Sequence, residues 1–127
     1  MALFFGIKMS LYSEYIKERE DFETIEFENS FLTYEISPDK KTCHICDLYI
    51  RKEKRKNGKE YLRLAREVIK KAEIDNVENL ICSVVKNIEL TDYVLNIHKK
   101  TGWEYSNENE EKFYLKITLE KFKKRFR

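Results

Sequence analysis

A strand, a loop and a helix in direct succession constrain the fold of this chain more than any other part of it. Residues 43–50, CHICDLYI, are rich in β-branched, aromatic and thiol side chains and predict a strand. A charged loop with Gly58 follows, and apolar residues at three- and four-residue steps then predict a helix over 61–72. The buried stripe of this helix is expected at Leu62, Ala65, Ile69 and Ala72, with Tyr61 and Val68 beside it. Because the helix begins right after the loop, its free N–H groups and positive dipole end suit a phosphate.

Two short patterns occur in this part of the chain and beyond it. The strand ends with Tyr49 and Ile50, and the loop has Arg55 in its first position and Gly58 in its fourth; further on, residues 98–103 read HKKTGW. In these features the chain resembles the GNAT N-acetyltransferase superfamily, in which a strand ending in an apolar pair precedes the loop (Gln/Arg)-x-x-Gly-x-(Gly/Ala) and Tyr-x-x-x-Gly-Phe follows later. Two of the three glycines of the chain stand where the family pattern needs one.

The resemblance implies a site for acetyl-CoA. In the family, the pantetheine arm of coenzyme A lies between two splayed parallel strands, which here places Leu48, Tyr49 and Ile50 along the arm. The N–H groups of the loop hold the pyrophosphate. The loop positions of this chain are Arg55, Lys56, Asn57, Gly58, Lys59 and Glu60. A solvated basic loop without a ligand is the alternative interpretation.

Two positions depart from the family pattern. Glu60 stands where the loop normally has Gly or Ala, and His98 stands in place of the tyrosine. A carboxylate about 5 Å from the pyrophosphate would cost on the order of 3 kcal/mol at an effective dielectric of about 20. The family tyrosine commonly protonates the leaving thiolate, and an imidazole that titrates near neutrality could do the same. His98 is therefore the candidate catalytic acid, and a histidine that contacts the free carbonyls at a helix end is the alternative.

The resemblance implies an N-acyltransferase that moves an acetyl group from acetyl-CoA to a primary amine. Such a reaction needs a base, and Asp47 and Glu35 on neighbouring strands are candidates. The alternative function is a catalytically degenerate GNAT-fold binding or structural protein, which Glu60 and the missing tyrosine favour. The richness in Lys, Glu and Asn would fit a phage or an AT-rich bacterial genome as the source.

Length and composition favour one domain over residues 1–127 that is able to bury a core. Apolar residues make up 42% of the chain, and the formal net charge is only +2, whereas a general nucleic-acid binder would be more basic. The apolar run at residues 2–5 is too short to span a bilayer, so we expect no membrane association and a cytoplasmic location. The three cysteines lie in strand-like runs and are expected to be reduced thiols.

The remaining patterns complete an α+β fold with a mostly antiparallel sheet, one central parallel strand pair and flanking helices, as in GNAT proteins. Strands are expected at 2–7, 22–28, 31–37, 42–50, 80–85, 103–106 and 113–119. Helices are expected at 11–20, capped by Ser10 with Leu11, Tyr15 and Ile16 inward, and at 92–101, capped by Thr91 with Val94, Ile97 and His98 inward. Gly102 ends the second of these.

Two further patterns are ambiguous. Cys43 and Cys46 have the spacing of a metal or redox pair, but three residues apart on a strand they face opposite sides, so we interpret them as structural and expect no metal. Residues 119–127 form a basic tail in which Glu120–Arg127 carries five cations and one carboxylate. The tail could dock on nucleic acid, an acidic partner or a second subunit of a homodimer, but a solvated, frayed terminus is the favoured interpretation.

Overall fold

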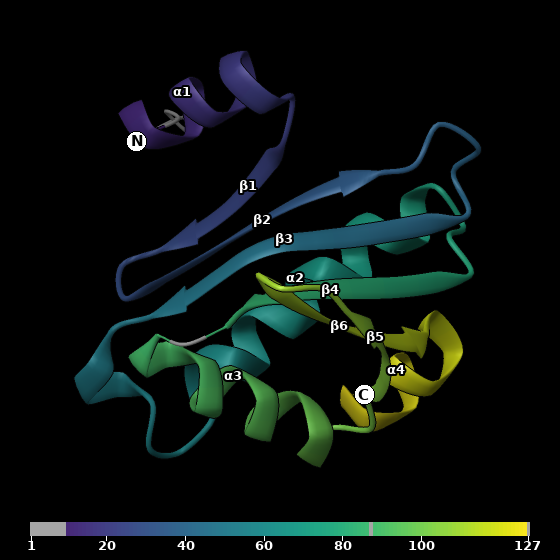
Figure 1. Cartoon of the computed structure of the whole chain (residues 1–127). Helices are drawn as coiled ribbons and strands as arrows, with labels where there is room; N and C mark the ends of the chain where they lie inside the picture. The colour runs from purple at the N-terminus through teal and green to yellow at the C-terminus, as the bar shows by residue number, and fades with distance from the viewer. Residues whose placement is uncertain (1–9, 87, 127) are drawn as a thin grey trace.

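The computed structural model describes residues 10–86 and 88–126. Six strands and four α-helices follow one another along this part of the chain, together with the short 3-10 helix η1 (Figure 1). The elements are α1 (Leu11–Glu20), β1 (Glu23–Phe27), β2 (Ser30–Ile36), β3 (Thr42–Ile50), η1 (Lys52–Lys54), α2 (Lys59–Ile74), β4 (Asn79–Val85), α3 (Glu89–Lys100), β5 (Glu104–Glu108), β6 (Lys112–Thr118) and α4 (Leu119–Phe126). The strand predicted at 2–7 lies outside the described residues.

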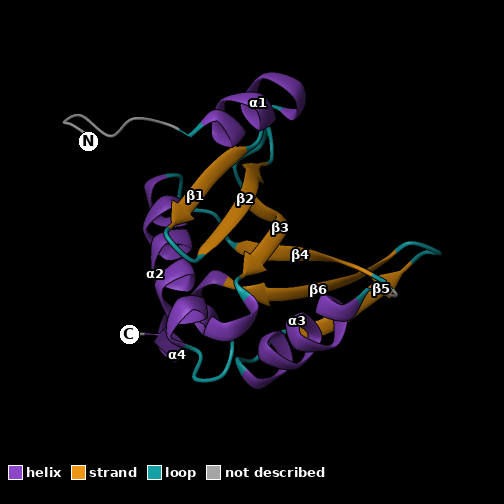
Figure 2. Cartoon of the chain, turned by 90° about the vertical axis from the view of Figure 1, so that its left-hand side faces the viewer, coloured by secondary structure: helices purple, strands orange, loops and turns teal. Residues whose placement is uncertain are grey.

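The six strands form one sheet in the order β1-β2-β3-β4-β6-β5. Every neighbouring pair is antiparallel except β3 and β4, which are joined by α2 as a crossover, so the predicted mixed fold class is confirmed. Helices α2, α3 and α4 lie on one side of the sheet, and α1 lies at its β1 end (Figure 2). We call the side away from α2, α3 and α4 the open face.

Helix α2 starts two residues before the predicted range and ends two residues after it. Its buried stripe is rotated relative to the prediction: Tyr61, Leu64, Ala65, Val68 and Ala72 are buried, whereas Leu62 and Ile69 are only partly buried. The prediction was wrong because the helix packs against both the sheet and α4, and this widens its buried face to include Leu64.

Helix α3 begins earlier than predicted. Its N-cap is Ile88, and Thr91 lies inside the first turn, where its hydroxyl accepts from the Ile88 N–H at 3.2 Å and donates to the Val85 carbonyl at 2.6 Å. The predicted end is confirmed: Gly102, at φ +100°, lets the N–H of Trp103 reach the His98 carbonyl and its own N–H reach the Lys99 carbonyl. A positive φ there explains the glycine.

The C-terminal basic segment is a helix and not a frayed tail, so the favoured interpretation of this segment was wrong. On α4, Leu119, Phe122 and Phe126 are buried, while Lys121 and Lys124 are exposed. Phe122 contacts Trp103 with ring centroids 5.5 Å apart and Phe126 at 4.9 Å. The three aromatic residues close the core beneath α2, and Lys123 pairs with Glu73 of that helix at 2.6 Å.

Helix α1 is confirmed with its Ser10 cap, whose hydroxyl accepts from the Ser13 N–H at 3.0 Å. Of its predicted inner residues only Ile16 is buried; Leu11 and Tyr15 are exposed. The helix is held to the open face of the sheet instead by Ser10 and Ser13, which both donate to Glu26, and by Tyr12, which packs on Phe31. None of the helices in the described part of the chain has the length and apolar character needed to cross a membrane.

Candidate functional site

Strands β3 and β4 separate toward their carboxyl ends. They pair from Thr42 opposite Asn79 to Ile45 opposite Cys82, and no pairing between the two strands follows in the described chain. At this point β3 also has a bulge against β2, because Thr33 pairs with Asp47 and Tyr34 with Ile45, which leaves Cys46 as the extra residue. A bulge bends its strand and strengthens the local twist, so it turns the end of β3 away from β4.

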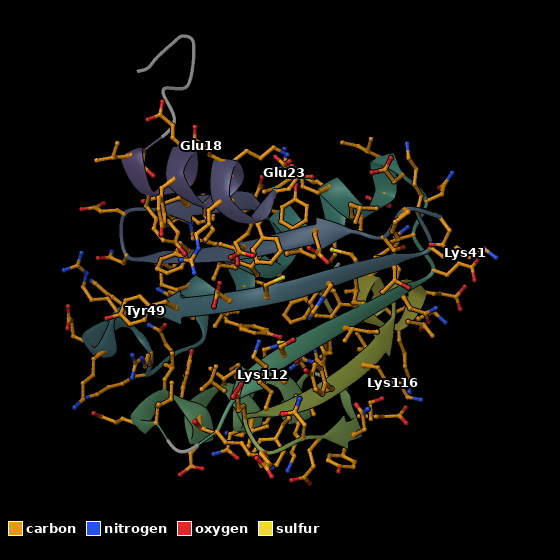
Figure 3. The ribbon with its side chains drawn as sticks, turned by 45° about the horizontal axis from the view of Figure 1, so that its top comes forward. Glu18, Glu23, Lys41, Tyr49, Lys112 and Lys116 are labelled. Carbon is orange, nitrogen blue, oxygen red and sulfur yellow. The ribbon has the colours of Figure 1, made fainter. Side chains whose placement is uncertain are left out.

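A cavity of about 200 Å³ lies between the two strand ends. Its walls come from β3, β4, the start of α3, and Tyr12 and Phe31 on the open face. The lining is mainly apolar, and Asp47 is the one charged side chain among the described residues that contribute to it. The Thr33 hydroxyl donates to Asp47 Oδ2 at 2.9 Å, which holds the carboxylate in place. We call this space the apolar cavity. Figure 3 shows Tyr49 and Lys112 toward this end of the sheet and Lys41 and Lys116 toward the other.

A second cavity of about 580 Å³ lies in front of the α2 N-terminus, between α2, α3 and α4. Cationic side chains dominate its polar lining, and no carboxylate of the described residues contributes to it. These cations are Arg55, Lys56, Arg66, Lys100 and Arg125. They come from four separate elements of the chain, so the fold and not a sequence run concentrates the charge. We call this space the basic cavity.

The start of α2 leaves backbone donors available beside the basic cavity. The first intrahelical bond runs from the Leu62 N–H to the Gly58 carbonyl, and the Lys59 N–H donates to Asn57 Oδ1. Among the described residues, no hydrogen bond engages the N–H groups of Glu60 and Tyr61. Gly58 has φ +73°, which turns the loop into the helix.

The Glu60 carboxylate turns away from this cavity. The buried Ser30 hydroxyl donates to Glu60 Oε1 at 2.9 Å, and Arg63 lies 3.5 Å from Oε2. Its side chain is 12% exposed and contributes to neither cavity. The expected repulsion between this carboxylate and an anion in the loop is therefore relieved by the contact with β2.

Arg55 lies between one lining residue of each cavity. Its Nε donates to the Ile50 carbonyl at 2.8 Å, and its guanidinium lies 5.6 Å from the ring centre of Tyr49 and 5.5 Å from that of Tyr93. Tyr49 lines the apolar cavity, and Tyr93 lines the basic one. A ligand with an apolar arm and a phosphate end would pass this arginine.

His98 is a core residue in this geometry. It is 0% exposed, lies against the rings of Tyr61 and Trp103, and lines neither cavity. Its Nδ1 contacts the Val94 carbonyl at 2.9 Å, and burial lowers its pKa to about 4. The imidazole is thus neutral near pH 7 and contacts a carbonyl inside the helix, not one of the free carbonyls at its end. This position gives no geometric support to the acid role.

The other predicted site residues divide between the cavities. Leu48 and Tyr49 line the apolar cavity, and residues 55–58 line the basic one, whereas Lys59 and Glu60 line neither. Ile50 is fully buried and presents only its carbonyl. Glu35 lies on the open face opposite His44 and outside both cavities.

Sequence reasoning missed several residues of the two cavities. Those it missed include Tyr12, Ser83, Arg66, Lys100 and Arg125. Ser83 was the one polar residue in the run 80–85, LICSVV, apart from the thiol, and this was a usable signal. Arg125 could not be found, because the helical fold of the tail places it.

Comparisons with known proteins agree on the architecture. No protein-family model matches the sequence, and no curated protein sequence does so either. Among solved structures, the PaiA N-acetyltransferase from Thermoplasma acidophilum, in complex with coenzyme A, gives a TM-score of 0.64 at 12% identity, over 85% of this chain and 69% of its own. A GNAT-family protein from Desulfovibrio desulfuricans gives 0.60 at 10% identity, over 77% and 69%. This chain has the GNAT fold.

Nourseothricin acetyltransferase also has a similar structure, with a TM-score of 0.62 at 12% identity over 72% of this chain. The aligned part makes up 58% of that protein. At these identities the likeness concerns the GNAT fold, with its splayed parallel strands and the loop before the crossover helix.

Proposed function

We propose that this chain is an acetyl-CoA-dependent N-acyltransferase that acetylates a primary amine. The observation that carries the proposal is the position of Arg55, whose guanidinium contacts Tyr49 of the apolar cavity and Tyr93 of the basic cavity at the α2 N-terminus. Coenzyme A has the same division, with an apolar arm that bears the thioester and an anionic nucleotide end.

The coenzyme would extend from the apolar cavity past Arg55 to the basic cavity. Leu48 and Tyr49 would flank the pantetheine arm, and the N–H groups of Glu60 and Tyr61 would bind the pyrophosphate together with Arg55. The remaining phosphate would lie among Arg66, Lys100 and Arg125, because guanidinium groups bind phosphate through paired hydrogen bonds.

The acceptor amine would enter the apolar cavity from the open face. Asp47 would bind its ammonium group, and the aromatic side chains of Tyr12, Phe31 and Tyr49 would favour a small acceptor with an apolar or aromatic body. In the reaction, the amine nitrogen would attack the thioester carbonyl carbon, the carbon–sulfur bond would break, and coenzyme A would leave as thiolate.

Calorimetric titration with coenzyme A tests the binding step. The wild type should bind, and Arg125→Ala should weaken binding roughly tenfold, because charge-assisted hydrogen bonds contribute about 1.5–3 kcal/mol each. Lys124→Ala is the matched control, since Lys124 is the exposed neighbour on the same helix and does not line the basic cavity. An absence of saturable binding by the wild type would exclude the proposal.

A thiol-release assay with acetyl-CoA and a panel of primary amines, tyramine among them, tests the chemistry. Acceptor-dependent release of free thiol is the expected result. Binding of coenzyme A without release for any amine would instead favour the non-catalytic binding protein.

A further inference from the structure

Polar side chains from four neighbouring strands line up across the open face. Glu35 on β2 lies directly opposite His44 on β3, and Ser83 on β4 lies directly opposite Tyr114 on β6. The buried residues on either side of them in sequence, such as Cys43, Cys82 and Leu115, point to the other face. The row therefore has no role in the main core.

The contact in the middle of this row is short and leads into the apolar cavity. His44 Nε2 lies 2.5 Å from Ser83 Oγ, which joins β3 and β4 at the point where their pairing ends. Ser83 lines the apolar cavity and is 9% exposed, whereas His44 does not line it. The serine hydroxyl thus lies between the imidazole and the cavity.

Charged groups surround the imidazole on both sides. Burial is the main effect on the His44 pKa and lowers it; Lys112 lowers it further, and Glu35 raises it. Cys46 and Asp47 follow on the same strand, and burial raises the pKa of the Cys46 thiol to about 12, so that group stays protonated. A neutral imidazole near pH 7 is a base, and a serine hydroxyl is its natural donor.

We propose that Ser83 and His44 form the proton relay that deprotonates the acceptor ammonium held by Asp47. This inference rests on the proposed acyltransferase function and adds its base. An ammonium N–H bond breaks and its proton moves to Ser83 Oγ, while the hydroxyl proton of Ser83 moves to His44 Nε2. The products are a neutral amine, whose lone pair attacks the thioester carbonyl, and an imidazolium that Glu35 stabilises and solvent deprotonates.

The relay separates two tasks that a single carboxylate would have to combine. Asp47 accepts from Thr33 and offers its other oxygen to the ammonium, so it fixes the acceptor. Ser83, on the opposite strand of the gap, faces the same cavity and takes the proton. The two groups lie on either side of the space between the separated strand ends.

Nitrogen-15 NMR of the histidine side chains tests the relay without any acceptor. The relay requires that Ser83 donates to Nε2, so neutral His44 must carry its proton on Nδ1. A purely structural contact would allow the opposite tautomer, in which Nε2–H donates to Ser83. His98, whose Nδ1 contacts the Val94 carbonyl, is the internal reference. An Nε2–H tautomer of neutral His44 would overturn the relay, whichever amine is the substrate.

Kinetics with acetyl-CoA and tyramine test the chemical step. Substitution of His44 by Gln should lower kcat about 100-fold, with KM for acetyl-CoA within about twofold, and should abolish the fall in rate on the acidic side of the pH profile. Ser83→Ala should behave alike, and Ser83→Thr, which keeps the hydroxyl, should recover most of the rate. Tyr114→Phe is the matched control on the same face.

The outcomes separate the two proposals. Wild-type kcat and an unchanged pH profile in H44Q, with coenzyme A binding intact, would overturn the relay alone. A stable acetyl group on Ser83, detected by mass spectrometry, would also overturn it, because the hydroxyl would then act as a nucleophile. A wild-type protein that does not bind coenzyme A would instead contradict the proposed function.

Discussion

Helix α4 should stabilise the whole domain, and Phe122→Ala tests this most directly. Phe122 is 1% exposed and contacts both Trp103 and Phe126. If the last eight residues were a solvated tail, truncating this side chain would cost nothing. If α4 closes the core, the truncation removes a buried aromatic ring from beneath α2.

The expected cost follows from the burial of the ring. Replacement of a buried Phe by Ala typically costs about 3–5 kcal/mol, which includes the cavity that remains. The two aromatic contacts of Phe122 are part of this loss, at about 0.5–1.5 kcal/mol each beyond their area. Domains of this size are stable by only about 5–15 kcal/mol, so the variant should lose roughly a fifth of its stability or more.

Urea unfolding followed by tryptophan fluorescence is the suitable assay. Trp103 is the only tryptophan of the chain, and it contacts Phe122 directly. The midpoint should fall while the slope of the transition stays the same, because the surface exposed on unfolding changes little. Lys124→Ala, on the exposed side of α4, should remain within about 0.5 kcal/mol of the wild type. A loss below about 1 kcal/mol in Phe122→Ala would refute the packing of α4 on the core.

Two further predictions concern the departures from the family pattern. Glu60→Gly should leave the affinity for coenzyme A, measured by calorimetry, within about threefold of the wild type. It should cost about 1–3 kcal/mol of stability, since the buried Ser30 hydroxyl loses its acceptor. A hundredfold gain in affinity would show that this carboxylate faces the ligand. His98 has a folded-state pKa of about 4, below its usual 6.5, so its contribution to stability is complete above pH 6.5 and falls by about 3 kcal/mol as the pH drops from 6.5 to 4. Urea unfolding measured at several pH values should show that the free energy of unfolding depends less steeply on pH in His98→Leu than in the wild type. An equal pH dependence in the two proteins would contradict the buried neutral imidazole.

The periodicity of the sequence was sufficient for most of the fold. The strand over 42–50 and the helix over 11–20 have the predicted bounds, and the parallel pair of β3 and β4 follows from the crossover through α2. Local pattern carries this information because alternation and helical spacing reflect which side chains are buried. The pattern could not give the rotation of α2, which depends on a second helix that packs against it.

The basic cavity shows why part of the site was out of reach. In the sequence, Arg125 is one of several neighbouring cations, and the sequence alone does not say which of them share a face of the helix. Once Phe122 and Phe126 fix α4 against the core, Arg125 lines the basic cavity whereas its neighbour Lys124 does not. The apolar residues of the segment therefore decide what its charges can do.

The loop position of Glu60 requires the same kind of reasoning. The loop motif places this residue beside the bound pyrophosphate, and from the motif alone a carboxylate there predicts repulsion of the pyrophosphate. In the fold, the turn between β1 and β2 brings the buried Ser30 to the start of α2, and its hydroxyl binds the carboxylate at 2.9 Å. The side chain then faces β2 while its backbone N–H stays beside the basic cavity, so one residue can contribute a donor to an anion and still carry a negative charge. A loop motif thus constrains the backbone of each position more strongly than it constrains the direction of the side chain, and the long-range partner of that side chain decides whether the substitution affects the ligand.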